Sequence, residues 1–398
     1  MVAHPANKAS SPPDFEARAK ALGPALRARS EAAAQSRRLP VETIEEMKEC
    51  GLFRMLQPER YGGFESHPNE FFKAQIALGE ACPSTAWVFG VVAVHSWQLS
   101  LFNGQAQEDV WAKNPSALIS SSYAPVGNVE PAEGGFRLSG RWSFSSGCEH
   151  CDWVFVGSFV PTPPDAKGPD MRTFLLPRSD YRIEDTWNVS GLKATGSHDV
   201  VVEDIFVPEH RTHKLMDGFR CESPGNEINT APLYRIPFGQ IFVRSVSTTA
   251  LGIAQGALDT FREIAAKKVA TSDRSKVSEE PTTQAIVARA GSTLEELKLV
   301  LFRSFNEMMD LASEGSPIPL DRRLQFRYES ALAVEKSREI VDELFTASGG
   351  RALFLDHPMQ RYFQDIHAAR AHYANNPDKP GRNLGGVQVG LRNKDFFV

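Results

Sequence analysis

The chain has 398 residues, of which 23% are charged and 41% are hydrophobic, so it has the length for two or three packed units and the composition of a soluble globular protein. Its formal net charge of −5 argues against a nucleic-acid-binding protein, which would carry a basic face. The longest apolar run, residues 86–94, is too short to span a bilayer, no apolar secretory segment opens the chain, and the five scattered cysteines favour a reduced cytoplasmic setting.

Helical patterns dominate the first 114 residues. Residues 1–13 are polar and are expected to form a loose tail, after which Asp14 is a candidate N-cap for a surface helix. Pro40 opens a second helix, which should end before Gly51. Further helices are predicted over 69–81, 84–102 and 105–113. The segment 84–102 is apolar on almost every side and should be buried, so His95 within it needs a hydrogen-bond partner.

The pattern changes at residue 115. Short β-rich runs broken by Gly and Pro predict a β-sandwich or small barrel over 115–232, with strands at 117–123, 135–138, 153–159, 172–176 and 200–207. Long helical segments follow at 237–270, 282–312, 319–348 and 358–375, and their lengths suggest an antiparallel four-helix bundle. We therefore expect an α+β protein with an N-terminal helical domain (1–114), a middle β domain (115–232) and a C-terminal helical bundle with a tail (233–398).

The stretch Arg141–Phe159 is the most informative part of the β region. On a regular strand, Ser143 and Ser145 would face one way, and Trp142 and Phe144 the other. Short hydroxyls beside a flat apolar wall suit a planar ring with polar edges, such as a flavin. An edge strand with solvated serines is the alternative interpretation.

This stretch resembles the flavin strand of the acyl-CoA dehydrogenase fold, and more closely that of two-component flavin monooxygenases, which include hydroxylases of 4-hydroxyphenylacetate and of steroid-derived phenols. Trp187–Pro208 and Pro358–His372 support the resemblance in the same order along the chain. It implies the oxygenase component of such a system, which hydroxylates a phenolic or indole-like substrate with O2 and reduced FMN or FAD through a C4a-hydroperoxide. It also implies a separate NAD(P)H-dependent flavin reductase and a homotetramer.

Two other functions stay open. The chain contains neither G-x-G-x-x-G nor G-x-x-x-x-G-K-[ST], so the usual signal for bound NAD(P) is missing, and a flavin here must be reduced by the substrate or by another protein. Reduction by the substrate would make an acyl-CoA dehydrogenase or oxidase. Residues 372–378 lack the glutamate that many acyl-CoA dehydrogenases carry there, which counts against that function without excluding it. The third alternative is a helical scaffold that has lost its flavin.

Two histidines are the candidate catalytic residues. On a helix, His372 would lie over Asp365 and Ala368, and by resemblance it matches the histidine placed near flavin C4a. An imidazole with an unperturbed pKa of about 6.5 suits removal of a phenolic proton. A histidine that caps a helix end is the alternative. By the same resemblance, His95 corresponds to a histidine near the substrate.

The candidate cofactor residues lie on two predicted strands. By resemblance, Ser145 matches the residue whose hydroxyl meets flavin N5, and Trp142 and Ser143 flank it. Ser121 and Ser122 lie on the preceding strand, where their hydroxyls could meet the pyrimidine edge of the ring.

A second candidate cofactor contact is Gly349-Gly350-Arg351, which resembles the Gly-Gly turn that meets the cofactor of a neighbouring subunit. Backbone N–H groups and one arginine suit an anion. A helix C-cap at Gly349 is an equally sound alternative on physical grounds. No metal site is expected, because His367 and His372 would point about 140° apart on a helix.

Overall fold

The computed structural model describes residues 13–163, 165, 168–269, 274–395 and 398. Its N-terminal part is helical, with α1 (Phe15–Ser36), α2 (Val41–Glu49), α3 (Pro68–Ala81), α4 (Pro83–Leu99) and α5 (Gly104–Trp111). Asp14 caps α1 as predicted, because its carboxylate accepts a hydrogen bond from the Ala17 N–H at 2.9 Å. The expected N-terminal tail lies outside the described residues except for Pro13.

The middle of the chain forms two sheets that pack face to face, so the predicted sandwich is confirmed and the barrel is not. In the described part, one sheet has the order β1-β4-β5-β8 and the other β2-β3-β7-β6. The strands are β1 (Ile119–Ser122), β2 (Asn128–Ala132), β3 (Gly135–Ser145), β4 (Trp153–Val160), β5 (Asp170–Pro177), β6 (Arg182–Glu184), β7 (His198–Pro208) and β8 (Thr212–Lys214). The sequence did not predict β2, β6 and β8, which are short and partly charged or proline-bearing.

The residues of β4 show how the sheets are packed. Val154 and Val156 are fully buried between the two sheets, in a core that includes Trp142 of β3. Phe155 points the other way and packs with Phe102 beyond the end of α4, their ring centroids 5.1 Å apart. The alternation along β4 therefore ties the sandwich to the N-terminal helices.

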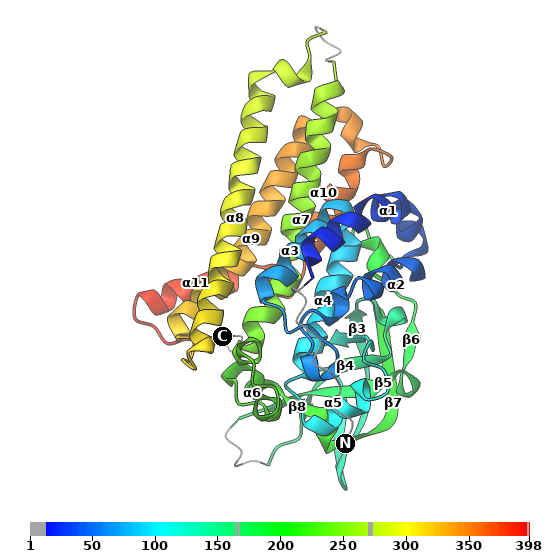
Figure 1. Ribbon diagram of the computed structural model, residues 1–398, viewed down its shortest axis with the longest axis vertical. Coiled ribbons are helices and arrows are strands. Elements are labelled where there is room, and N and C mark those ends of the chain that lie inside the picture. The colour runs from blue at the N-terminus through cyan, green and yellow to red at the C-terminus, as the bar shows by residue number, and fades with distance from the viewer. Residues whose placement is uncertain (1–12, 164, 166–167, 270–273, 396–397) are drawn as a thin grey trace, which may run out of the picture.

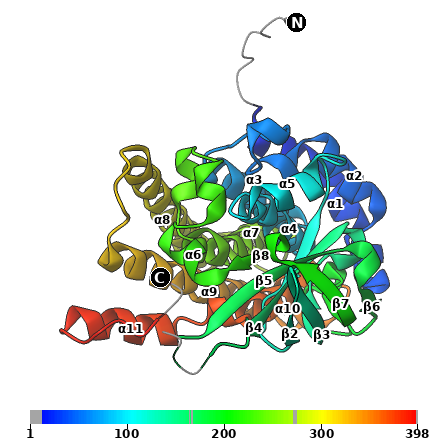
Figure 2. The same ribbon diagram turned by 90° about the horizontal axis from the view of Figure 1, so that it is seen from below.

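The C-terminal part is a bundle of α7 (Phe238–Lys267), α8 (Pro281–Ser313), α9 (Leu320–Ala347) and α10 (Pro358–Arg370), preceded by α6 (Leu215–Arg220) and followed by α11 (Asp378–Gln388). Figures 1 and 2 both place α4 between this bundle and the sheets. As predicted, α4 is buried along nearly its whole length. None of the described helices is both long and apolar enough to cross a membrane.

The last predicted helical segment is too long. The helix ends at Arg370, and His372 has the extended backbone φ −63°, ψ 138°. Two contacts terminate α10: the Asn375 side-chain amide donates to the Ala369 carbonyl at 2.8 Å, and Arg327 donates to the Ala374 carbonyl at 3.0 Å. His372 therefore does not stack over Asp365 and Ala368 as a helix would require.

Candidate functional site

The end of β3 departs from regular strand geometry at Phe144. This residue has a left-handed backbone (φ +68°), and the pairing of β3 with β7 shifts between Trp142 and Ser145. The predicted alternation is therefore wrong, because the irregularity reverses the sides on which the following residues lie. Ser143 and Phe144 are exposed together, and Ser145 and Ser146 are buried together.

Ser145 carries a buried polar group that a ligand could pair with. Its side chain is fully buried, and its hydroxyl oxygen has no hydrogen-bond partner among the described residues. A buried hydroxyl normally finds a partner. The position therefore fits a bound group that carries a polar atom at this point, as the sequence predicts for a flavin.

The other predicted residues of this strand have different surroundings. The Trp142 ring lies in the core between the sheets, and its indole N–H donates to the Gly157 carbonyl at 2.9 Å, so the ring is not available to a cofactor. The expectation that this side chain contacts a flavin is thus corrected, because the apolar face of β3 is covered by the second sheet. The Ser143 carbonyl accepts from the Ser122 hydroxyl at 2.7 Å.

The neighbouring strand β1 brings further hydroxyls to this region. It runs parallel to β4, with Ser121 opposite Phe155. Ser121 is half-buried, whereas Ser120 is fully buried and its hydroxyl has no partner in the described part of the chain. The hydrogen bond from Ser122 to the Ser143 carbonyl places β1 beside the end of the candidate flavin strand. Contact of Ser121 and Ser122 with a flavin stays a prediction.

His95 is completely buried on α4, and its predicted hydrogen bond is present. Its Nδ1 lies 2.6 Å from the Ile119 carbonyl oxygen, and Nε2 has no partner among the described residues. Burial lowers the pKa of His95 to about 4, although the carbonyl opposes this effect. The ring is edge-on to Phe155 and Tyr123, at centroid distances of 5.5 and 6.2 Å.

His372 lies at the start of the short turn Tyr373–Asn375 and is half-buried. Its Nδ1 accepts a hydrogen bond from the Ala374 N–H at 3.1 Å. Desolvation and the nearby positive charge of Arg327 lower the pKa of His372 to about 4. The capping alternative is therefore correct in part, but the ring caps the following turn and not the helix end.

Trp87 on α4 joins His372 to the flavin strand. Its ring lies edge-on to the His372 ring, with a centroid distance of 5.7 Å. Its indole N–H donates to the Ser146 hydroxyl at 3.1 Å. No sequence pattern distinguishes Trp87 from the other apolar residues of α4, because only its contacts with Ser146 and His372 set it apart.

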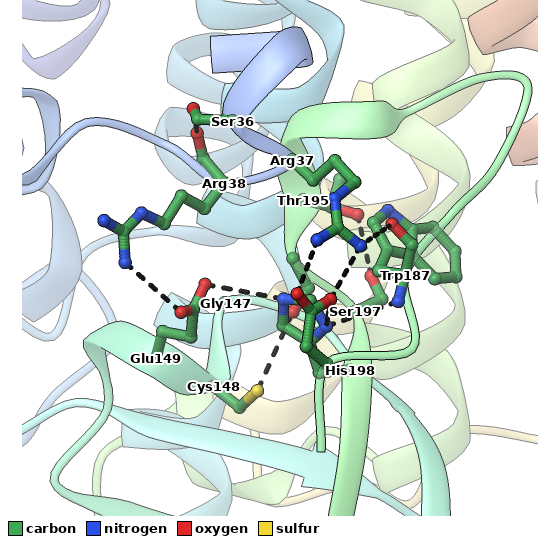
Figure 3. A network of polar contacts seen from close by, with 12 residues as sticks. Ser36, Arg37, Arg38, Gly147, Cys148, Glu149, Trp187, Thr195, Ser197 and His198 are labelled. Atoms are coloured by element: carbon green, nitrogen blue, oxygen red, sulfur yellow. Dashed lines mark hydrogen bonds and ion pairs between the residues drawn. The ribbon is translucent and has the colours of Figure 1, made fainter. Parts of the chain in front are cut away.

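A polar network holds the loop before β7 against the end of α1 (Figure 3). His198 Nδ1 accepts from the backbone N–H groups of Thr186 and Trp187 at 3.2 and 3.3 Å. Arg37 pairs with Asp185 at 2.5 Å, and Arg38 donates to Glu149 at 3.3 Å. These contacts fix the segment that carries Thr195 and Ser197 beside the Gly147 turn, whose N–H donates to the Thr195 carbonyl at 2.8 Å.

The Gly349-Gly350-Arg351 turn lies at the end of α9, away from the sheets (Figure 1). Gly349 has φ +76° directly after the Ser348 C-cap, so the alternative of a helix cap holds. Arg351 is exposed and pairs with Asp356 at 2.7 Å. Within one chain, the turn shares no described contact with Ser145 or His372. Its contact with a cofactor stays a prediction.

No group of three or more His, Cys, Asp or Glu side chains in the described residues is arranged to hold a metal ion. The described residues offer instead a buried hydroxyl without a partner at Ser145 and two imidazoles, His95 and His372, whose pKa values are lowered by burial and whose rings have aromatic neighbours. This combination suits an organic cofactor and an aromatic substrate.

Comparisons with known proteins agree with this geometry. Residues 20–114 match the acyl-CoA dehydrogenase N-terminal domain, and residues 245–377 match the acyl-CoA dehydrogenase C-terminal domain. The chain is 39% identical to the flavin-dependent monooxygenase oxygenase subunit HsaA of Rhodococcus jostii (strain RHA1), over 96% of this chain and 100% of that protein. It is 35% identical to the FADH(2)-dependent resorcinol hydroxylase oxygenase component of Rhizobium sp. (strain MTP-10005), over 91% of each.

A solved structure is equally similar. The crystal structure of 3-HSA hydroxylase from Rhodococcus sp. RHA1 superposes with a TM-score of 0.92 at 38% identity, over 97% of this chain and 99% of that one. The resemblance stated from three sequence stretches is thus confirmed across nearly the whole length. The chain belongs to the oxygenase subunits of flavin-dependent monooxygenases, which are built on the acyl-CoA dehydrogenase fold.

Proposed function

We propose that this chain is the oxygenase component of a two-component system that hydroxylates a phenolic or indole-like ring with O2 and reduced FMN or FAD. The single observation that carries the proposal is the buried hydroxyl of Ser145, which has no partner among the described residues. The next residue, Ser146, accepts a hydrogen bond from Trp87, and the Trp87 ring contacts His372. The relatives named as a flavin-dependent monooxygenase subunit and an FADH(2)-dependent resorcinol hydroxylase support the same reaction class.

The residues present fit a flavin. Ser145 would meet the ring near N5, and Ser121, Ser122 and Ser143 would lie along its polar edge. When bound, the reduced flavin supplies the activated oxygen atom that is transferred to the substrate. What the chain contributes is orientation, exclusion of water and control of protons around that atom.

His95 is assigned the role of hydrogen-bond acceptor for the substrate hydroxyl. Its Nδ1 faces a carbonyl oxygen at 2.6 Å, so Nδ1 must carry the proton and donate it. Nε2 of the neutral ring then holds a free lone pair, and it has no partner in the described structure. A phenolic O–H placed there would be oriented, and its proton could be accepted as oxygen is transferred.

His372 is assigned the opposite role. Its Nδ1 accepts from the Ala374 N–H, so the proton of the neutral ring is on Nε2. His372 therefore presents a donor to the site, although the sequence had suggested a base. A donor beside the reacting oxygen would stabilise developing negative charge there.

The neighbours of the His95 ring are aromatic. Tyr123 lies between His95 and α7, where its ring is 5.2 Å from Phe242 and 5.9 Å from Phe238. The Tyr123 hydroxyl is held by Gln98 through a short hydrogen bond, and burial raises the pKa of this phenol well above its usual value. Such a surround excludes water and favours a flat, mostly apolar ring over an acyl chain.

The direct test supplies the purified protein with chemically reduced flavin, O2 and resorcinol or a steroid-derived phenol, and measures hydroxylated product against hydrogen peroxide. We expect product from the native chain and mostly peroxide from His372→Ala, with product reduced by roughly 10²-fold. Absence of any hydroxylated product across a panel of phenols and indoles would contradict the proposal. Reduction of bound oxidised FAD by an acyl-CoA, without a reductase, would instead establish a dehydrogenase.

The same proposal includes a separate NAD(P)H-dependent flavin reductase, a cytoplasmic location and a homotetramer. The surface beyond the Gly349 turn supports an assembly, because Leu353, Phe354 and Leu355 are 69%, 59% and 82% exposed in the isolated chain. Adjacent apolar side chains of this size usually mark a contact with another protein. Light scattering of the native chain and of Leu355→Asp tests this, and a monomeric native chain would contradict it.

A further inference from the structure

A continuous line of hydroxyl groups connects α4 to the loop before β7. The Trp87 indole contacts the Ser146 hydroxyl at 3.1 Å, Ser146 contacts Ser197 at 2.7 Å, and Ser197 contacts Thr195 at 2.7 Å. Thr195 then reaches the Leu192 carbonyl at 2.9 Å. Trp87, Ser146, Thr195 and Ser197 are all buried, so water does not compete for these bonds.

The direction of every bond in this line follows from counting hydrogens. A carbonyl only accepts, so Thr195 must donate to Leu192. Each hydroxyl has a single proton, so Ser197 donates to Thr195, and Ser146 donates to Ser197. Ser146 can then only accept from the indole N–H of Trp87. Because each hydroxyl can donate in only one direction, removal of any one of these hydroxyl groups leaves a neighbouring polar group buried without a partner.

The line ends on a strained peptide. Leu192 has φ +51°, a left-handed conformation that is costly for a residue with a branched side chain. Its carbonyl accepts from Thr195, and its N–H donates to the Asp365 carboxylate on α10 at 2.5 Å. The preceding residue, Gly191, lies so close to α10 that a Cβ there would be 2.1 Å from the Gln364 carbonyl oxygen. The loop is therefore clamped to α10 at this point.

We propose that Asp365 is a positioning residue of this site. By holding the Leu192 peptide, it fixes the hydroxyl line, which in turn fixes Ser146 beside Ser145 and the Trp87 ring against His372. The inference rests on the proposed function, because it assigns Asp365 to the placement of the two groups that serve the reaction. The described hydrogen bond of Asp365 is to the Leu192 N–H, and Asp365 shares none with Ser145, His95 or His372.

The burial of Asp365 supports a role beyond packing. The side chain is 6% exposed and forms no ion pair within 4 Å among the described residues. Burial raises its pKa to about 6, although the Leu192 N–H and the charges of Arg361 and Lys193 favour the ionised form. A buried carboxyl group is costly, so a position that served only to fill space would be better occupied by an apolar residue.

The first test needs neither flavin nor substrate. Asp365→Asn keeps an oxygen for the Leu192 N–H, Asp365→Ala removes it, and Ser247→Ala is the control because it removes a buried hydroxyl contact to Ser330 outside the line. Amide hydrogen exchange is measured on the apo proteins. We expect Asp365→Ala to accelerate exchange at least tenfold in residues 190–198 and 372–376, and Asp365→Asn and Ser247→Ala to leave both segments unchanged.

Equal exchange in Asp365→Ala and the native chain would overturn the proposal. So would acceleration spread evenly over the protein in both Asp365→Ala and Ser247→Ala, since this would indicate a general loss of stability. Because this readout is independent of flavin chemistry, it can fail while the proposed function stands, or hold while that function fails.

The second test measures the ratio of hydroxylated product to hydrogen peroxide. We expect the ratio to fall between about tenfold and a hundredfold in Asp365→Ala, with the substrate KM changed less than threefold, and to be restored in Asp365→Asn. Ser197→Ala breaks the same line, so Asp365→Ala with Ser197→Ala should be no worse than the more severe single variant. Additive losses in the double variant, or an unchanged ratio in Asp365→Ala, would overturn the proposal.

Discussion

Lowering the pH from 7 to 5 should reduce the free energy of unfolding, and His95 should account for a definable part of the loss. Its side chain is 0% exposed, and burial lowers its pKa to about 4, whereas an unfolded histidine titrates at about 6.5. Between these values the unfolded chain binds a proton that the folded chain does not. Stability therefore decreases as the pH falls through this range.

The size of the effect follows from the two pKa values. Because the pKa of His95 is about 6.5 in the unfolded chain and about 4 in the folded chain, the free energy of unfolding lost through this residue reaches at most about 3 kcal/mol, below pH 4. About 2 kcal/mol of this loss should occur between pH 7 and pH 5. Asp365 acts in the opposite direction, because burial raises its pKa to about 6 and the folded chain then binds the additional proton. The total pH dependence therefore does not isolate one group, and a variant is needed.

His95→Gln keeps an N–H group for the Ile119 carbonyl but does not titrate. In urea unfolding followed by tryptophan fluorescence, the loss of stability between pH 7 and pH 5 should be smaller than in the native chain by about 2 kcal/mol. His213→Gln is the matched control, since His213 is 2% exposed and burial also lowers its pKa to about 4. It should change the pH dependence equally but leave product formation intact. An identical pH dependence in His95→Gln and the native chain would refute the reasoning.

Three further predictions concern the flavin strand and its neighbours. Ser145→Ala removes a hydroxyl without a partner, so the free energy of unfolding of the apo protein, measured by thermal unfolding, should change by less than about 1 kcal/mol. Equilibrium titration should show that reduced flavin binds the variant roughly tenfold more weakly. Phe144→Gly relieves a left-handed backbone at an exposed residue, so calorimetry should show stability that is unchanged or higher by up to about 1 kcal/mol; a clear loss would contradict the strain. In Gly157→Ala the new Cβ would lie 2.4 Å from the Tyr123 carbonyl oxygen, so we expect a loss of about 2 kcal/mol, whereas Gly350→Ala, with nothing within 4 Å, should cost little.

The sequence predicted those elements whose pattern is decided by burial alone. The segment 84–102 is apolar on all sides because α4 is enclosed by the sheets and the bundle, and a regular pattern records this directly. The end of α10 is different. No Gly or Pro follows Arg370 at once, so the pattern continues, and the helix is stopped by the side chains of Asn375 and Arg327. Arg327 lies on α9, and a contact with another helix leaves no local signal in the sequence.

The same reasoning applies to the candidate site. His95 stands out in the sequence as an imidazole in an otherwise apolar helix, whereas Ser145 is selected through the resemblance to the flavin strand of related monooxygenases. The irregularity in the pairing of β3 at Phe144 could not be predicted, because residues with a left-handed backbone are normally Gly or Asn and this residue is aromatic. The sequence indicates Asp365 only as a helical neighbour of His372, because its contact with Leu192 involves a residue 173 positions away.

The tautomers of the two histidines provide a final prediction, since the backbone partner of each Nδ1 decides which nitrogen can act. His95 Nδ1 faces a carbonyl oxygen and must be protonated, and His372 Nδ1 faces the Ala374 N–H and must not be. Had α10 continued to residue 375, the Ala374 N–H would be used within the helix, and His372 could adopt either form. The end of α10 therefore converts His372 into a donor at Nε2 and leaves His95 as the acceptor.

Nitrogen-15 NMR of histidine-labelled protein at pH 7 distinguishes these forms, with assignments from His95→Gln and His372→Ala. We expect a protonated Nδ1 for His95 and a protonated Nε2 for His372, both in neutral rings because the pKa of each is lowered to about 4. The same tautomer at both positions would refute the assignment of one acceptor and one donor. A protonated Nδ1 at His372 in particular would free its Nε2 to act as a base and would return to it the role assigned to His95.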